Sequence, residues 1–167
     1  MKITNMEELF NNQLEDLYDA EQRLVKALPK MMEAASSSEL RTAFENHLEE
    51  TKGHAGRLEQ IFNHIGRKPK AKTCDAMKGL IEEGEDVISS IGKSSLRDAG
   101  LIAAGNRVEH YEIAAYGSAK AFAGMLGFQT SVDTLDRTLA EEKAADHKLT
   151  QIAESMVNEG ALHSQTA

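Results

Sequence analysis

Acidic side chains in this sequence of 167 residues occur where helical periodicity predicts apolar ones. Successive residues of an α-helix are rotated by about 100°, so buried residues share one stripe and charged residues are expected opposite it. Glu21 lies about 40° from Leu17, on a stripe that includes Leu24, and Glu112 lies within about 40° of Val108. We therefore expect both carboxylates to point into the protein interior.

A later segment repeats this pattern twice. Glu142 and Asp146 both fall within about 20° of the centre of the stripe that contains Leu135 and Leu149. Residues at i and i+4 stack on one helical face, so these two acids are expected to share it. Glu109 lies on the flank of its stripe, one turn before the inward acid of the same segment.

One segment carries imidazoles as well as an acid. His47, Glu50 and His54 line one flank of a stripe defined by Leu48 and Leu58, about 50 to 110° from its centre. Their spacings of three and four residues place them on a common face. Either histidine could serve as a metal ligand, and the sequence leaves the choice between His54 and His47 open.

Several inward carboxylates need a source of positive charge. A buried ionised carboxylate without a partner costs several kcal/mol or changes its pKa, and Lys and Arg fall mainly outside these stripes. Hard oxygen donors with one or two imidazoles suit iron or manganese better than zinc or copper. The sequence therefore predicts a site for two Fe ions, with Mn as the second choice, and the following ligands: Glu21, Glu50, His54, Glu109, Glu112, Glu142 and Asp146, with His47 as the alternative histidine.

Each inward-facing acid also has a simpler explanation that needs no metal. A single Glu on an apolar face is often a boundary residue whose stem packs while its carboxylate reaches water. To account for the whole pattern without a metal, this explanation would have to apply separately to the acids of every segment. Tyr18, Tyr111 and Tyr116 lie near the acids, either as ordinary packing aromatics or as donors of hydrogen bonds to ligand carboxylates.

The segments that must position these residues are helical. Ala, Leu, Glu and Lys are frequent, and there are only 2 Pro and 12 Gly. Pro29 is expected to kink its helix, because the apolar pattern continues beyond it. Gly66, Gly127 and Gly160 are expected to end helices. Apolar periodicity predicts four long helices and one short one: Met6–Ala35, Glu39–Ile65, Arg97–Leu126, Thr130–Asn158 and, between the second and third, Ala76–Ser89.

This order predicts an all-α, ferritin-like antiparallel four-helix bundle. The first two long helices and the last two are joined by short turns, and a long crossover with an extra helix connects the two pairs. We expect one domain over residues 1–160 and a flexible tail over 161–167.

Composition excludes several classes of function. A net charge of -8 without a basic stripe argues against nucleic acid, and no apolar stretch predicts a membrane span. One cysteine and no export signal at the start favour the cytoplasm. Phosphate loops, CxxC pairs, HExxH and GxSxG motifs are absent, so any electron donor is a separate molecule of unknown identity.

Four ordered stretches resemble the YciE/YciF family of bacterial ferritin-like stress proteins. They are LYDAE, HLEETKGH, VEHYEIAAYG and LAEEKAADHKLT. The resemblance implies the rubrerythrin branch of the fold, a dinuclear metal centre and a homodimer. The usual Glu-x-x-His pair is missing, because Gly53 follows Glu50 at i+3.

These expectations lead to one functional hypothesis with two alternatives. The leading hypothesis is a di-iron protein that reacts with O2 or peroxide in a stress response, as an oxidoreductase of the ferroxidase or peroxidase kind. The first alternative is a non-catalytic stress or structural homodimer that metal stabilises. An iron-storage cage is weaker, because no fifth C-terminal helix offers cage contacts.

Overall fold

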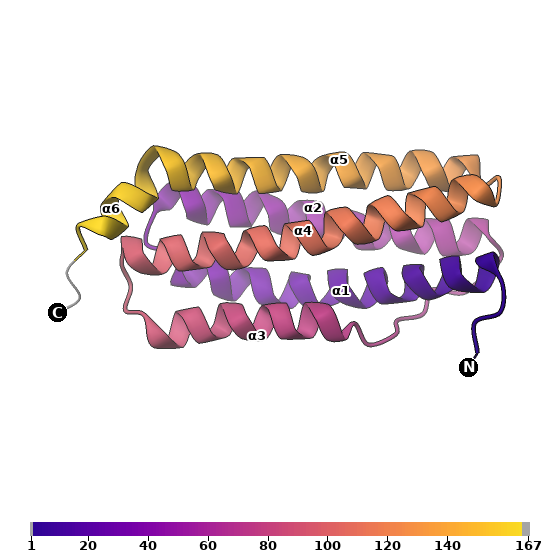
Figure 1. The fold of residues 1–167 in the computed structure, drawn as a ribbon, viewed down its shortest axis with the longest axis horizontal. Helices are drawn as coiled ribbons and strands as arrows, with labels where there is room; N and C mark the ends of the chain where they lie inside the picture. The colour runs from indigo at the N-terminus through magenta and orange to yellow at the C-terminus, as the bar shows by residue number, and fades with distance from the viewer. Residues whose placement is uncertain (1, 165–167) are drawn as a thin grey trace.

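The computed structural model describes residues 2–164, which form a bundle of long helices (Figure 1). No strand occurs within these residues, so the all-α prediction is confirmed. The helical elements are α1 (Met6–Ala34), α2 (Ser38–His64), α3 (Asp75–Ser90), α4 (Ser95–Met125), α5 (Gln129–Ile152), a π-helical turn (Ala153–Val157) and α6 (Asn158–Leu162).

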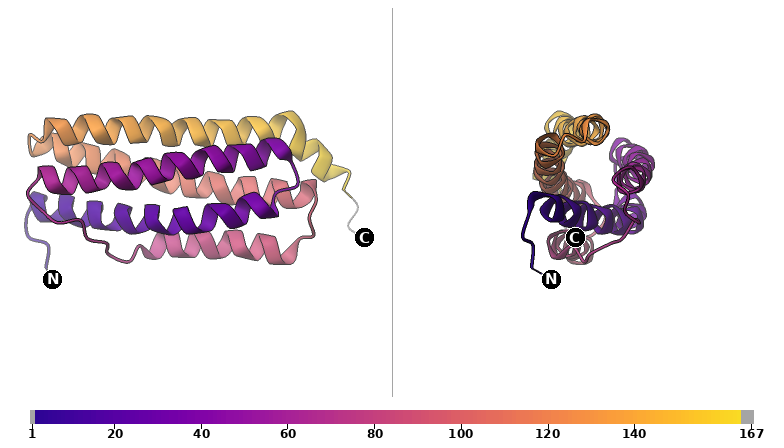
Figure 2. Two further views of the ribbon diagram at one scale, coloured as in Figure 1. Left: turned by 180° about the vertical axis from the view of Figure 1, so that it is seen from behind. Right: turned by 90° about the vertical axis from the view of Figure 1, so that its right-hand side faces the viewer.

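Two antiparallel hairpins make up the bundle. α1 pairs with α2, α4 pairs with α5, and the segment between α2 and α4 runs back along the length of the molecule (Figures 1 and 2). The short helix α3 lies in this crossover and packs outside the four long helices, against α1 and α4. The predicted topology, including the extra helix, is therefore confirmed.

Local sequence signals set most helix boundaries. The Ser37 side chain caps α2 by accepting a hydrogen bond from the Leu40 backbone N–H at 3.3 Å. Gly66 and Gly127 follow α2 and α4 with φ of 72° and 74°, a region that favours glycine. The first helix continues through Pro29, as the apolar pattern predicted.

The C-terminal helix differs from the prediction around Gly160. The chain passes through the π-helical turn and continues helically to Leu162, so Gly160 does not end the helix. A Cβ atom at Gly160 would lie 3.0 Å from Ser95 Oγ, so a close approach to α4, rather than a helix stop, explains a glycine here. Of the predicted tail, residues 165–167 lie outside the described residues.

The interior consists of two apolar clusters separated by a polar layer. One cluster includes Leu24, Phe44 and Leu101, and the other includes Leu14 and Leu135. Along each long helix, the two clusters occupy opposite halves, and buried Glu and His side chains come between them. The layer between the clusters is the part of the fold that apolar packing does not explain.

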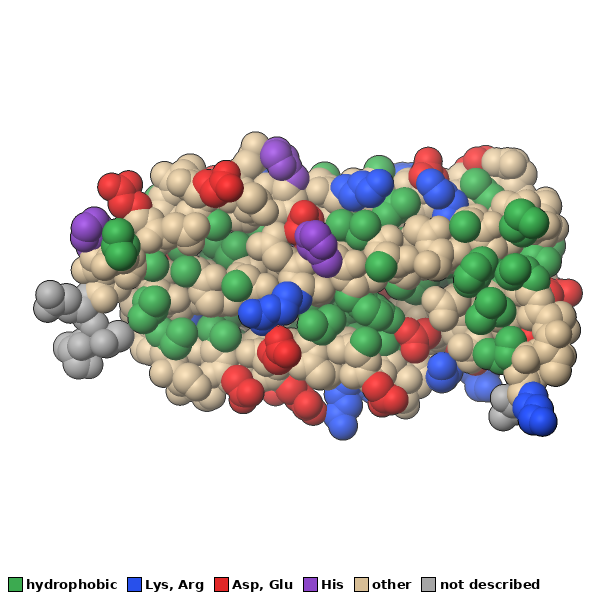
Figure 3. Space-filling model, viewed as in Figure 1, with side chains coloured by type: hydrophobic (Ala, Val, Ile, Leu, Met, Phe, Trp, Pro, Cys, Tyr) green, Lys and Arg blue, Asp and Glu red, His purple; other side chains and the backbone are tan. Residues whose placement is uncertain are grey.

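Charged and apolar side chains are mixed on the surface that faces the viewer in Figure 3. Figure 3 shows separate acidic and basic side chains on the face formed by α3, α4 and α5, with no basic stripe on that face. Among the described helices, none combines the length and apolarity that a membrane crossing requires.

Candidate metal centre

The polar layer contains two adjoining groups of side chains that could hold metal ions. His47 of α2, Glu109 and Glu112 of α4 and Glu142 of α5 form the first group, whose ligand atoms all lie within 4.8 Å of one another. His47 Nε2 lies 3.1 Å from Glu109 Oε1 and 3.9 Å from Glu142 Oε2. All four side chains are buried, so the group is enclosed by the bundle.

The second group shares one carboxylate with the first. It consists of Glu21 of α1, His54 of α2 and Glu142, again with ligand atoms within 4.8 Å. His54 Nδ1 lies 2.9 Å from Glu142 Oε1 and 3.5 Å from Glu21 Oε1. Glu142 directs one oxygen toward each histidine, so it belongs to both groups and would be a shared ligand if each held a metal ion.

Many polar atoms in this layer lack hydrogen-bond partners. Buried polar atoms in proteins are nearly always paired, so a local concentration of unpaired ones needs an explanation. The buried oxygens without a partner in the layer are Glu21 Oε2, Glu109 Oε2, both Glu112 oxygens and Glu142 Oε2. They all belong to carboxylates of the two groups that could hold a metal ion.

Helical geometry explains why these residues meet. His47 and His54 are seven residues apart and therefore point within about 20° of each other. Glu109 and Glu112 stand one turn apart on α4. A Cβ atom at Gly105 would lie 2.8 Å from Leu149 Cδ1, so glycine allows α4 and α5 to approach closely one turn before Glu109.

Burial and mutual repulsion raise the pKa values of the central carboxyls. Burial is the largest cause for Glu112, whose pKa lies well above its ordinary value, and the charges of Glu142 and Glu21 add to it. The pKa values of Glu21 and Glu142 are also raised by burial, although hydrogen bonds to His54 act in the opposite direction. Without a cation, these carboxyls therefore tend to retain protons.

The same carboxylates raise the pKa values of both histidines. Burial alone would lower the pKa of His54, but its hydrogen bonds to Glu142 and Glu21 and their charges raise it to about 10. Burial likewise opposes the charge on His47, and Glu109 and Glu50 outweigh that effect and raise its pKa. Both imidazoles thus experience a strongly negative environment.

Outside the two groups, neighbouring side chains fix the ligands in place. The Tyr116 hydroxyl donates a hydrogen bond to Glu21 Oε1. His54 Nε2 lies 2.9 Å from Glu141 Oε2, and Arg57 Nη2 donates to the other Glu141 oxygen at 3.0 Å. Such carboxylate contacts hold the ring of a metal-binding histidine in one orientation.

Sequence reasoning missed the pair formed by Glu141 and Arg57. Both residues lie off the apolar stripes, and only residues on or beside those stripes were considered as ligands. Arg57 follows His54 at i+3 and Glu141 immediately precedes Glu142. Their proximity in sequence to two of the candidate ligands was the available signal.

Two of the expected ligands lie outside both groups. The Glu50 side chain is 45% exposed, and its Oε2 lies 3.4 Å from His47 Nδ1, on the outer side of the imidazole. The Asp146 side chain accepts a hydrogen bond from Asn106 Nδ2 at 2.6 Å and lies 3.3 Å from exposed His110. Glu50 is rotated by about 60° from His47, and Asp146 by about 40° from Glu142, which turns both away from the centre.

The structure brings the other expected ligands together, and both histidines with them. Four Glu and two His form the two groups, which is the composition of a dinuclear carboxylate site in a bundle. The distribution of ligands among the helices differs from that of the usual Glu-x-x-His sites, since α2 supplies both histidines and α4 supplies two glutamates. Paired Glu-x-x-His motifs are therefore unnecessary to assemble this set.

Comparison with known proteins identifies the family. The model of DUF892, described as a domain of unknown function, matches residues 5–162. The chain belongs to this family. It is 45% identical to Protein YciF of Escherichia coli K12 over 162 residues, which cover 96% of this chain and 98% of YciF. The resemblance found in the four sequence stretches is confirmed.

Solved structures of relatives show the same fold. The crystal structure of the E. coli stress protein YciF superposes with a TM-score of 0.90 and 45% identity, covering 94% of this chain and 99% of that one. YcfI of Rhodopseudomonas palustris gives a TM-score of 0.89 and 43% identity, covering 91% and 97%. A Xanthomonas campestris protein, at 18% identity and a TM-score of 0.73, covers 92% of this chain and 94% of its own and shares the fold. The ferritin-like bundle is thus confirmed.

Proposed function

We propose that this DUF892 protein is a dinuclear metal protein that reacts with O2 or peroxide during stress. Iron is the proposed metal and manganese the second choice. The observation that carries the proposal is the set of buried ligand residues, which come from four helices, form two groups that share Glu142 and leave several carboxylate oxygens unpaired. The E. coli relative is described as a stress protein, and we extend that role to this chain.

The charge of the layer supports a requirement for cations. Glu21, Glu109, Glu112 and Glu142 carry a formal charge of −4 when ionised, and two fully protonated histidines offset at most +2. Within residues 2–164, the ion pairs of these four carboxylates involve only His47 and His54. Two divalent ions would neutralise the carboxylates and supply partners for their unpaired oxygens.

The donor set favours iron or manganese. Carboxylate oxygens are hard ligands, and two imidazoles are too few for the nitrogen- or sulfur-rich sites that zinc and copper prefer. Glu112, with both oxygens unpaired, and Glu142 are free to bind in either terminal or bridging fashion. This freedom is useful at a centre whose ions change oxidation state.

The protein's own residues prepare the site for redox chemistry. When bound, two Fe(II) ions would each supply one electron to O2 or peroxide. The Tyr116 hydrogen bond restrains Glu21, and the contact with Glu141 restrains the His54 ring. The apolar clusters cover the layer at its two ends along the bundle.

Oxygen consumption by Fe(II)-loaded protein tests the proposed reaction. Anaerobically loaded protein should consume O2 or peroxide on mixing, and its Fe(II) should be oxidised to Fe(III). The matched control is the Glu142→Ala variant, which lacks the shared carboxylate and should lose this reactivity. Loaded wild-type protein that leaves both oxidants unconsumed would refute the redox function while leaving metal binding intact.

A second function is a metal-stabilised structural homodimer in the cytoplasm. One observation favours it: the ligands come from α1, α2, α4 and α5, so bound metal would join all four long helices. This alternative predicts a higher melting temperature with metal but no consumption of oxidant. Sedimentation of the loaded protein tests the homodimer itself, with two chains expected per particle.

A further inference from the structure

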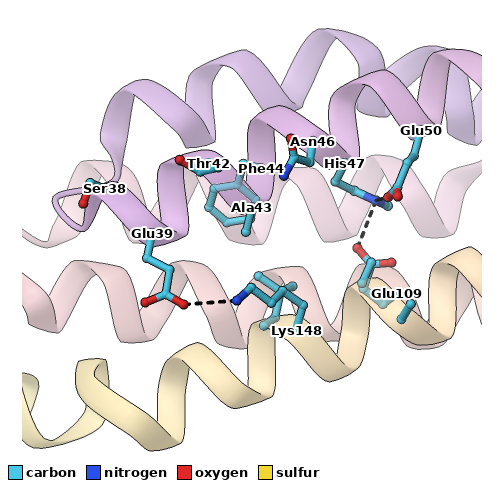
Figure 4. Close-up of a pocket in the computed structure, with 13 residues that line it drawn as sticks. Ser38, Glu39, Thr42, Ala43, Phe44, Asn46, His47, Glu50, Glu109 and Lys148 are labelled. Atoms are coloured by element: carbon cyan, nitrogen blue, oxygen red, sulfur yellow. Dashed lines mark hydrogen bonds and ion pairs between the residues drawn. The ribbon is translucent and has the colours of Figure 1, made fainter.

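A groove between α2 and α5 leads from the surface to one side of the polar layer. Its volume is about 580 Å³. Figure 4 shows α2 on one side, with His47 and Glu50, and Glu109 at the inner end. The small side chains of Ala43 and Ala145, from facing helices, leave the groove open.

Side-chain exposure decreases steadily along this groove. Glu50 is 45% exposed at the mouth, His47 7% exposed beyond it and Glu109 3% exposed at the inner end. The successive contacts are 3.4 Å from Glu50 Oε2 to His47 Nδ1 and 3.1 Å from His47 Nε2 to Glu109 Oε1. Metal-binding groups therefore extend from solvent to the interior without a break.

One buried oxygen at the inner end of the groove has no hydrogen-bond partner. It is Glu109 Oε2, which belongs to a lining side chain that is more than nine-tenths buried. Lys148 is the only Lys or Arg among the described lining residues, and it is paired with Glu39 at 3.1 Å. Three carboxylates line the groove against Lys148 and His47, so its formal charge stays negative even when His47 is protonated.

Beyond His54, further along the same pair of helices, the contacts between α2 and α5 have the reverse character. There the outer nitrogen of His54 contacts Glu141, and the Arg57 guanidinium binds both oxygens of that carboxylate. A cation approaching here would meet a positive charge and a carboxylate that is already occupied. The two parts of the α2–α5 interface thus differ in charge.

We propose that the groove between α2 and α5 is the entry route for hydrated divalent cations, and that Glu50 captures each ion before it reaches His47 and Glu109. The inference rests on the proposed metal site but not on its redox reaction. It gives Glu50 a different role from that of a permanent ligand. A negative charge at the mouth of a cleft raises the local concentration of cations and their rate of entry.

The rate of metal uptake tests this role. Apo protein is mixed with Co(II) in a stopped-flow instrument, and the fluorescence of its tyrosines is followed, since Tyr116 contacts Glu21 in the layer. The Glu50→Gln variant should load about three- to tenfold more slowly, with a difference that shrinks at high salt. It should bind as many Co(II) ions per chain at equilibrium as wild type.

Two further variants complete the test. Glu45→Gln removes an exposed carboxylate from the same helix outside the groove and should load at the wild-type rate. Ala145→Phe should narrow the groove and slow loading without removing a charge. If this variant loads at the wild-type rate, ions do not enter through the groove.

The outcomes separate the entry route from the site. Gln keeps an oxygen acceptor near His47 Nδ1. If the only role of Glu50 is to orient the His47 ring, Glu50→Gln should therefore load Co(II) at the wild-type rate. That result would overturn the entry role and leave the proposed function standing. A Glu50→Gln variant with reduced stoichiometry would make Glu50 a ligand instead. Wild-type protein that binds no Co(II), Fe(II) or Mn(II) would overturn both proposals.

Discussion

The polar layer and the apolar clusters beside it follow opposite physical rules. In the clusters, residues such as Leu14 and Leu101 are completely buried among other apolar side chains and stabilise the fold directly. In the layer, Glu112 is equally buried but has two unpaired oxygens and a raised pKa. The bundle tolerates this unfavourable layer because the clusters on both sides hold the helices together.

Residues of the apolar clusters increase the stability of the fold, whereas the acids of the polar layer reduce it. Replacing buried charged groups by neutral ones is often neutral or stabilising, whereas truncating a packed apolar side chain is consistently costly. A layer of unpaired acids inside a stable bundle is therefore evidence of a function that requires them. Substitutions in the two regions should have opposite effects on the apo protein.

The largest effect is expected in an apolar cluster. Leu101→Ala removes a completely buried side chain and should lower the free energy of unfolding by about 2–5 kcal/mol. The loss should be similar for apo and metal-loaded protein, because the side chain lies outside the metal groups. Urea unfolding of both forms measures it. If Leu101→Ala lowered the free energy of unfolding of the loaded form alone, the apolar cluster and the polar layer would not contribute independently to stability.

A smaller effect of opposite sign is expected in the layer. Glu112→Gln should raise the free energy of unfolding of apo protein by about 1–3 kcal/mol near pH 8, because the amide needs neither a buried charge nor proton uptake on folding and can donate to neighbouring carboxylates. The same variant should gain less stability from added metal than wild type. The exposed control Glu45→Gln should change stability by less than about 0.5 kcal/mol. Destabilisation of the apo protein by Glu112→Gln would contradict the comparison.

A further expected effect is a dependence of apo stability on pH. The folded pKa values of Glu112, Glu21 and Glu142 are raised, as are those of His47 and His54, so the folded state binds more protons than the unfolded state. Stability contributed by such groups is complete below their unfolded pKa values, about 4.3 for Glu and 6.5 for His, and is lost as pH rises through the folded values. For His54 the loss extends to about pH 10.

Thermal melting between about pH 5 and pH 9 measures this dependence. The melting temperature of apo protein should fall across the range, and bound metal should flatten or reverse the decline by lowering the same pKa values. Glu112→Gln should show a shallower decline than wild type. An apo melting temperature that rises with pH would mean that the carboxyls are not held together in the folded protein.

The fold could be predicted from sequence because its signals are local. Ser37 caps a helix, Gly66 and Gly127 end helices, and the apolar stripes identify the faces that pack. The end of the last helix was misjudged at Gly160, where a glycine is explained by a tertiary contact with Ser95. A contact of that kind leaves no local trace in the sequence.

The candidate site could be predicted only in part, for geometric reasons. Helical phase correctly placed Glu21, Glu112 and Glu142 in the interior. It could not resolve positions on the flank of a stripe, where a rotation of about 40 to 60° separates buried His47 from exposed Glu50. Whether a flank faces a neighbouring helix or solvent depends on how the helices are rotated in the bundle.

The number of metal ions bound per chain tests the central claim most directly. Anaerobic equilibrium dialysis of the complete chain against Fe(II), followed by metal analysis, should give about two ions per chain, because the two groups of ligands share only Glu142. Glu142→Ala should lose at least one ion, while Glu45→Ala should retain both. No bound iron in the wild-type protein, or equal binding by the two variants, would contradict the assignment of the polar layer as a dinuclear metal centre.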